Sequence, residues 1–245
     1  MRIVLDHLVN YPAAVLRPTA VLVVAAWLVG SACGGQSVTE RAAKTRADQA
    51  RQVARRAGLP AAVQDFLARY ATSAARSFTV NYAPDPGGTT IVLTQSPPDR
   101  RLDLVQGAIT ESFFATSAGS FDCVLRGRAW TCTNTSTESS QPAPLAPADI
   151  DRTVATLKAS QASFTFRVVA RRLAGTSASC LETVPRAGAG GGGANGPTSL
   201  CISPEGAPLL VEGGGTQLHA TRYTTAVDKR RLRLPAPPTP VTTAG

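Results

Sequence analysis

The sequence predicts an α+β fold in which helices lie against one face of a large antiparallel sheet. Segments that alternate apolar and polar residues with period two are short and closely spaced, which favours antiparallel hairpins over β-α-β units. Segments with helical periodicity stand before and between two series of such strands, an order typical of α+β domains. Charged residues make up 17% of the chain and aromatic residues 5%, and 21 glycines and 18 prolines supply turns.

The first 32 residues have the composition of a signal peptide. Residues 20–29 are ten consecutive apolar residues that follow Arg17 and precede small residues. A membrane span requires about 20 apolar residues, whereas this length matches the apolar core of a secretory signal. We therefore expect residues 1–32 to be removed during export, so that the protein acts outside the reducing cytosol.

Cys33 directly follows this segment, and its surroundings resemble a bacterial lipobox. Ser31 and Ala32 stand where the lipobox has small residues, and Gly30 stands where it normally has leucine. The resemblance implies that Cys33 is the first mature residue and carries acyl chains such as palmitate, which anchor the protein on the extracytoplasmic face of the cell membrane. Two alternatives stay open: an ordinary signal peptidase cuts nearby, or the segment remains as a membrane anchor.

The other four cysteines form two pairs, which in an exported protein predict two disulfides. Cys123 and Cys132 are symmetric about a two-residue turn at Gly127-Arg128, so alternation makes them a non-hydrogen-bonded cross-strand pair with Cα atoms about 4.5 Å apart. Cys180 and Cys201 flank a glycine-rich segment and belong to neighbouring expected strands. We expect these local pairings, with the two crossed pairings as alternatives.

Two helices are expected before the first strand. Residues 36–57 begin with a capping box at Ser37 and Glu40, but their apolar positions are mostly alanine. Residues 33–60 are therefore predicted to form a lipidated, basic tether between the membrane and a domain that spans 61–235. An amphipathic helix follows, with apolar residues at i, i+3, i+4 and i+7: Val63, Phe66, Leu67 and Tyr70.

The remaining elements form two series of strands separated by a loop and a helix. The first series is expected at 78–82, 89–95, 100–105, 109–116 and 121–125, followed by an internal loop at 133–148 that is rich in Ser, Thr, Pro and Ala. Asp149 then caps a helix with Ile150, Val154 and Leu157 on one face. The second series is expected at 163–168, 179–184, 199–202, 208–211 and 217–223, and residues 236–245 form a proline-rich tail.

Motifs for catalysis and metal binding are lacking in the sequence. The mature chain has one histidine, His219, and with the cysteines assigned to disulfides no metal-ligand spacing remains. No serine lies in a Gly-x-Ser-x-Gly motif, and the glycine run at 188–196 lacks the Gly-Lys-Ser/Thr of a P-loop. We therefore predict a protein that is not an enzyme and has no metal or cofactor.

The net charge of +9 is dispersed, with basic residues concentrated at 40–56 and 229–233. Export argues against nucleic acid as a partner. Near an acylated Cys33, the first group could lie against anionic headgroups, which contributes about 1 kcal/mol per close basic residue. The alternative is a helix whose basic face is simply solvated.

Taken in order, several motifs resemble those of actinobacterial envelope lipoproteins with a LolA-like fold, of the LppX and LprG type. These motifs are the segment at Cys33, QSPPDRRLDL at 95–104, the Cys123–Cys132 hairpin, Leu173-Ala174-Gly175 before Cys180, and LCISPEGAPL at 200–209. The resemblance covers residues 61–235. It implies a half-open antiparallel barrel with helices over its concave face, no catalytic residues, and an apolar cavity for acyl chains or another hydrophobic ligand.

Two functions are compatible with these observations. In the first, the protein binds or carries a lipid or other hydrophobic ligand between sheet and helices, and the candidate lining residues are Phe66, Leu67, Ile91, Leu93, Ile150, Phe164, Phe166 and Val168. In the second, the same side chains fill the core, and the protein is a non-enzymatic sensing or interaction module that binds another envelope protein through an exposed apolar patch. Periodicity identifies a buried face, but a filled face and an open one have the same pattern.

Overall fold

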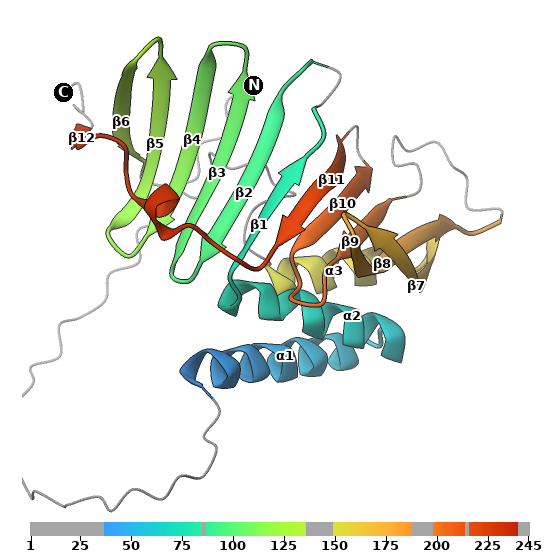
Figure 1. The fold of residues 1–245 in the computed structure, drawn as a ribbon. Coiled ribbons are helices and arrows are strands. Elements are labelled where there is room, and N and C mark those ends of the chain that lie inside the picture. Colours follow the sequence, from blue (N-terminus) through green and yellow to red (C-terminus); the bar gives the residue numbers. More distant parts are fainter. Residues whose placement is uncertain (1–36, 85–86, 136–148, 188–197, 214–215, 240–245) are drawn as a thin grey trace, which may run out of the picture. The chain divides into compact units, whose positions relative to one another are not determined.

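The described part of the chain folds into a twelve-stranded sheet and three α-helices in a computed structural model (Figure 1). The structure describes residues 37–84, 87–135, 149–187, 198–213 and 216–239, which all belong to the unit Gln36–Gly245. The expected signal peptide, Cys33, most of the loop at 133–148 and the glycine run lie outside the described residues.

The helices lie at the positions that periodicity predicted. They are α1 (Val38–Arg56), α2 (Ala61–Thr72) and α3 (Ile150–Ser160), with short 3-10 helices η1 (Ser73–Ala75) and η4 (Lys229–Leu232). None of the described helices is both long and apolar enough to span a membrane.

Three strands, β1, β4 and β9, have the expected bounds, and most others extend the expected segments by a few residues, most clearly β7 and β8, which pair over ten residues each. Their bounds are β1 (Phe78–Tyr82), β2 (Thr90–Ser96), β3 (Asp99–Gln106), β4 (Ile109–Thr116), β5 (Gly119–Arg126), β6 (Ala129–Thr135), β7 (Phe164–Leu173), β8 (Thr176–Pro185), β9 (Ser199–Ile202), β10 (Pro208–Gly213), β11 (Thr216–Thr224) and β12 (Pro238–Thr239).

The sheet joins both series of strands in the order β12-β6-β5-β4-β3-β2-β1-β11-β10-β9-β8-β7. The strands β1 and β11 pair at its centre, so the last long strand connects the two series. The Tyr82 hydroxyl adds a buried link across this centre by donating to the Pro208 carbonyl at 2.7 Å. The sheet is not closed, because β12 and β7 form separate edges.

The expectation of a purely antiparallel sheet is wrong at one edge. Pro238 and Thr239, in the expected proline-rich tail, pair in parallel with Cys132 and Thr133 of β6 and make the sheet mixed. The Thr239 hydroxyl also donates to the Cys132 carbonyl at 3.0 Å. A short edge strand tolerates proline, because the missing backbone donor can face away from its neighbour.

Both expected disulfides are confirmed. Cys123 faces Cys132 across the β5–β6 hairpin, whose turn is closed by Arg126 and Ala129 as predicted, and their Cα atoms are 4.0 Å apart. Cys180 and Cys201 are direct partners on β8 and β9, with Cα atoms 3.9 Å apart. Each bridge therefore fixes the register of neighbouring antiparallel strands.

The helix α1 differs from the tether expected for this segment. Its capping box is present, and its C-terminus is closed by Gly58 at φ +74°, with the Leu59 amide donating to the Ala54 carbonyl at 3.1 Å. However, Ala43, Ala50 and Ala54 are buried and α1 packs along α2. Alanine side chains are short enough for close helix packing, so the composition that suggested a loose stalk instead docks α1 on the folded unit.

Candidate functional site

The helices α2 and α3 cover one face of the strands β7 to β9. A row of apolar residues crosses this face in register, from Val168 to Leu181 to Leu200 and on to Val211 of β10. Residues of this row pack with both helices in a cluster centred on Phe66, Leu67, Val154 and Leu157. The layer between the helices and the sheet is therefore apolar on both sides.

A small, mainly apolar pocket of about 230 Å³ lies within this layer. We call it the helix–sheet pocket. Its wall is formed by α2, α3 and the strands β8, β9 and β10, together with the residue just before β9. The lining residues are Tyr70, Thr153, Leu157, Leu181, Thr183, Thr198, Ser199, Leu200, Val211 and Glu212.

The polar groups of the helix–sheet pocket lie at defined places on its wall. Burial raises the pKa of Tyr70, against the opposing charge of Arg100, so the Tyr70 hydroxyl is a neutral donor at physiological pH. The hydroxyls of Thr183 and Thr198 lie 2.9 Å apart and satisfy each other. Glu212 pairs with His219 at 3.1 Å. The pocket therefore offers an apolar surface with few polar groups, as hydrophobic ligand sites do.

Seven of the eight candidate lining residues belong to two separate clusters. Phe66 and Leu67 are buried in the helix–sheet cluster, and Ile150, Phe166 and Val168 are packed against it. Ile91 and Leu93 belong to a second cluster on β1–β4 and β8–β11, and Phe164 belongs to neither. None of the eight lines the helix–sheet pocket.

One candidate, Ile150, instead lines a larger and more polar pocket of about 500 Å³ between α1 and the start of α3. The other residues of its wall are Arg46, Gln49, Ala50, Gln52, Val53, Ala71, Asp149 and Asp151. This wall carries charges of both signs, from Arg46, Asp149 and Asp151. Since acyl chains bind in apolar sites, the larger pocket is a poor match for an acyl chain.

The residues that do line the helix–sheet pocket were only partly visible in the sequence. The periodicity that singled out Phe66 and Leu67 on α2 also includes Tyr70, one turn further along that helix. The periodicity of α3 likewise includes Leu157. The strand residues Leu200 and Val211 follow from alternation, but their place on the wall depends on how the helices cross the strands.

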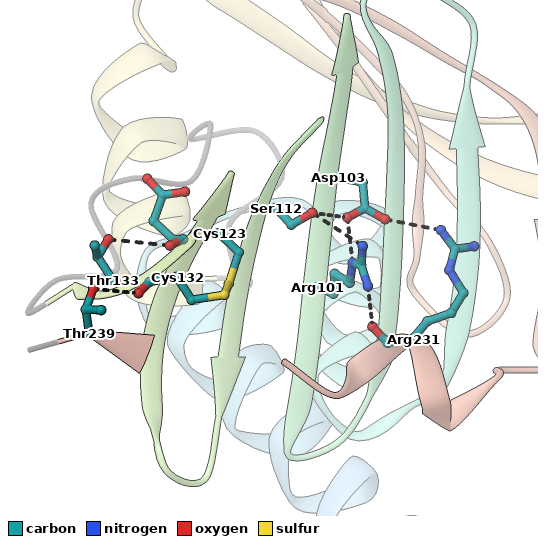
Figure 2. The surroundings of a disulfide bond; sticks show 9 residues. Arg101, Asp103, Ser112, Cys123, Cys132, Thr133, Arg231 and Thr239 are labelled. Carbon is teal, nitrogen blue, oxygen red and sulfur yellow. Dashed lines mark hydrogen bonds and ion pairs between the residues drawn. A yellow bond between two sulfur atoms is a disulfide. The ribbon is translucent and has the colours of Figure 1, made fainter. Parts of the chain in front are cut away.

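The opposite face of the sheet holds a buried polar cluster beneath the C-terminal segment (Figure 2). Asp103, whose side chain is 4% exposed, accepts from Arg101 at 2.5 Å, from Ser112 at 2.6 Å and from Arg231 of η4 at 3.1 Å. Arg101 also donates to the Arg231 carbonyl at 2.8 Å, and its guanidinium lies 4.9 Å from the centre of the Phe114 ring. Every one of these contacts is internal, so the cluster fixes the C-terminal segment across the sheet.

A second internal ion-pair group lies on β7 and β8, where Glu182 is buried. Arg167 donates to it at 2.6 Å, and Arg171 donates to its other oxygen. Burial alone would raise the pKa of Glu182, but the hydrogen bonds and charges of the two arginines outweigh burial and lower this pKa below its ordinary value of 4.5.

Replacement of Glu182 by glutamine is expected to reduce stability in a pH-dependent manner. The lowered pKa of the folded state means that this stabilisation is present above the unfolded pKa and is lost as pH falls through the folded pKa. We expect Glu182→Gln to lower the free energy of unfolding by about 2 kcal/mol at neutral pH. In urea denaturation, the difference from wild type should shrink as pH falls below about 5 and through the lowered pKa of Glu182.

The control is Asp65→Asn, which removes an exposed pair with Arg51 at 2.9 Å. This change should cost less than about 1 kcal/mol. A Glu182→Gln deficit that stays constant down to the lowest pH would contradict the argument.

The described residues contain no group of three or more His, Cys, Asp or Glu side chains that could hold a metal ion. Comparison with known proteins gives no further guide, since no family model, no curated protein and no solved structure matches the chain.

Proposed function

We propose that the protein is an exported lipoprotein, anchored to the cell membrane by acyl chains on Cys33, that binds a lipid or other hydrophobic ligand between its sheet and helices. In this proposal the open sheet is a LolA-like half-barrel, and the protein carries out no catalysis. The observation that supports it best is the mainly apolar helix–sheet pocket between α2, α3 and β8–β10. Its position matches the cavity that the family resemblance implies.

The size of the helix–sheet pocket limits the ligand. Its volume of about 230 Å³ is below the range of about 300–1,000 Å³ that is common for small-molecule sites. The pocket therefore suits one segment of an aliphatic chain, with the rest of the ligand outside it. The contacts that we propose are those of the pocket wall, chiefly Tyr70, Leu157, Leu181 and Leu200.

Native mass spectrometry of residues 36–245, purified from an oxidising compartment, tests ligand binding directly. The proposal predicts a stoichiometric adduct that organic extraction removes and that lipid analysis assigns to a chemical class. A protein at the mass of the bare chain with two disulfides would contradict it. Lipidation is tested separately, by the mass of the N-terminal peptide of the full-length protein.

Filling the pocket should abolish this adduct. Val211 lines the pocket and is half-buried, so Val211→Phe places a ring in the space proposed for the ligand. Val184→Phe is the matched control, because Val184 is 38% exposed on β8 and lies outside the pocket wall. We expect the adduct to fall at least about tenfold in the first variant only. Equal adducts in both variants would exclude this pocket as the site.

One observation favours the second candidate, a sensing or interaction module with a filled core. Phe66, Leu67 and Leu93 are each at most 2% exposed, so these expected lining residues pack against protein. The exposed apolar patch that this function requires is not evident, because the large apolar residues found exposed in the described chain, Val38, Ile109 and Val184, lie on three separate elements. A bare protein in the native mass spectrum would favour this candidate.

A further inference from the structure

The outward face of α1 carries four exposed basic residues. Helical spacing brings Arg41, Lys44, Arg55 and Arg56 to the side opposite the buried alanines, and all four are exposed. None of them forms an ion pair with any residue that the structure describes. We call these four residues the α1 basic face.

Two exposed acidic residues of α1, Glu40 and Asp48, offset part of this charge. Asp48 pairs with Arg51 at 3.4 Å, and Arg51 also pairs with Asp65 of α2 at 2.9 Å. The six basic and two acidic residues of α1 leave a net charge of +4, 6 minus 2, along a helix that is about 28 Å long, at about 1.5 Å per residue.

Packing fixes the direction in which this face points. Ala43, Ala50 and Ala54 are at most 2% exposed and contact the rest of the folded unit. Figure 1 shows α1 as the outermost helix, with α2 between it and the strands. The charged side chains of α1 therefore lie on the side of the helix opposite its buried alanines.

The chain length ahead of α1 limits how far this face can lie from a membrane. Only five residue steps separate Cys33 from Val38, the first residue of α1. Even a fully extended chain covers at most about 18 Å over five residues, at about 3.6 Å each. An acylated Cys33 lies at the bilayer surface, so the start of α1 must lie close to the headgroups.

A second feature points the same way. Val38 is 76% exposed, the most exposed of the large apolar residues in the described chain. An apolar side chain at the membrane-proximal end of a basic helix is the combination that binds bilayer interfaces, through apolar insertion and attraction to anionic lipids.

We propose that the α1 basic face, together with Val38, docks on the anionic bilayer that holds the anchor. This inference rests on the lipid anchor in the proposed function, but not on the ligand pocket. The folded unit then lies directly on the membrane with α1 between the bilayer and α2, and it does not stand off on a stalk. The sheet projects away from the bilayer.

Vesicle binding by residues 36–245, which lack the anchor but contain the whole described fold, tests this surface by itself. We expect binding to phosphatidylcholine vesicles that contain phosphatidylglycerol, little binding to vesicles of phosphatidylcholine alone, and loss of binding at high salt. Replacing the four residues of the α1 basic face by glutamine should weaken binding at least about 30-fold.

The matched control removes four exposed basic residues elsewhere: Arg126, Arg128, Lys229 and Arg230. It changes the net charge equally, so it should weaken binding less than about threefold. A second pair of variants tests the apolar contact. Val38→Asp should weaken binding at least about fivefold, whereas Ile109→Asp, at a site that is 50% exposed on β4, should not.

The outcomes are separable. Equal losses in the two glutamine variants would show a general charge effect and overturn the proposal, as would failure of the wild-type unit to bind anionic vesicles at low salt. An unlipidated Cys33 would remove the anchor while leaving vesicle binding measurable. A missing ligand in the native mass spectrum would affect the pocket alone.

Discussion

Gly206→Ala is expected to lower the free energy of unfolding by about 4 kcal/mol. Gly206 has φ +82°, and a Cβ atom there would lie 2.5 Å from the Arg69 carbonyl oxygen and 3.1 Å from the Ser73 amide nitrogen. These are backbone atoms at the end of α2, so the helix would have to move. Urea denaturation under oxidising conditions measures the loss.

Gly175→Ala is the control for this prediction. Gly175 has nearly the same backbone conformation, at φ +79°, but a Cβ atom there would have no neighbour within 4 Å. Its substitution should therefore cost only the conformational strain, about 1–2 kcal/mol. If the two variants lost equal stability, the turn at Gly206 would not be in tight contact with α2.

Gly206 belongs to a tight turn within the sequence motif at 200–209. Within the segment 203–208, the Ser203 side chain accepts from the amides of Glu205 and Ala207, and the Gly206 amide donates to the Ser203 carbonyl at 3.0 Å. The turn leads into β10, and Tyr223 donates to Glu205 from β11. This motif therefore joins α2 to the strands behind the helix–sheet pocket.

Local patterns predicted most of the fold. The alternation at Phe78–Tyr82 gave the bounds of β1, and the cap at Asp149 is present, with its side chain accepting from the Arg152 amide at 3.0 Å. The turn at Gly127-Arg128 favoured Cys132 as the partner of Cys123 over the crossed pairings, and the structure confirms it. In each case the determining residues lie within about ten positions of one another, where periodicity and turn chemistry carry the information.

Long-range features escaped prediction, for physical reasons. The parallel pairing of Pro238 with Cys132 joins residues about a hundred positions apart, and nothing local in a proline-rich tail specifies it. The register shift between Asn81 and Tyr82 changes which residues of β11 share a face with β1. Such irregularities depend on how two strands meet.

The candidate site shows the same division. Apolar periodicity predicted that Phe66, Leu67 and Leu93 are buried, and they are. Whether space remains beside them depends on side-chain volumes from several elements at once, so the pocket wall at Leu200 and Val211 could not be predicted from any one segment. The docking of α1 was not predicted, because alanine side chains can bury little apolar surface area. However, their small size permits close packing of α1 against α2.

Asp103→Asn is expected to lower the free energy of unfolding by about 3 kcal/mol and to release the C-terminal segment. The substitution keeps the shape of the side chain but removes the negative charge from between Arg101, whose side chain is 14% exposed, and Arg231. A buried cation without its counter-charge is costly, whereas exposed pairs contribute little. The exposed pair of Asp48 with Arg51 supplies the control, since Asp48→Asn should cost less than about 1 kcal/mol.

Two further measurements identify the mechanism of this loss. Because Asp103 and Arg101 hold η4 through Arg231, trypsin should cleave within Lys229–Leu232 faster in Asp103→Asn than in Asp48→Asn. The double variant Arg101→Met with Asp103→Leu removes both buried charges and should recover much of the lost stability. The apolar replacements restore the packing but not the hydrogen bonds that fix the C-terminal segment. A double variant as unstable as Asp103→Asn would therefore show that the lost hydrogen bonds of the polar cluster, and not the unpaired charge, account for the loss of stability.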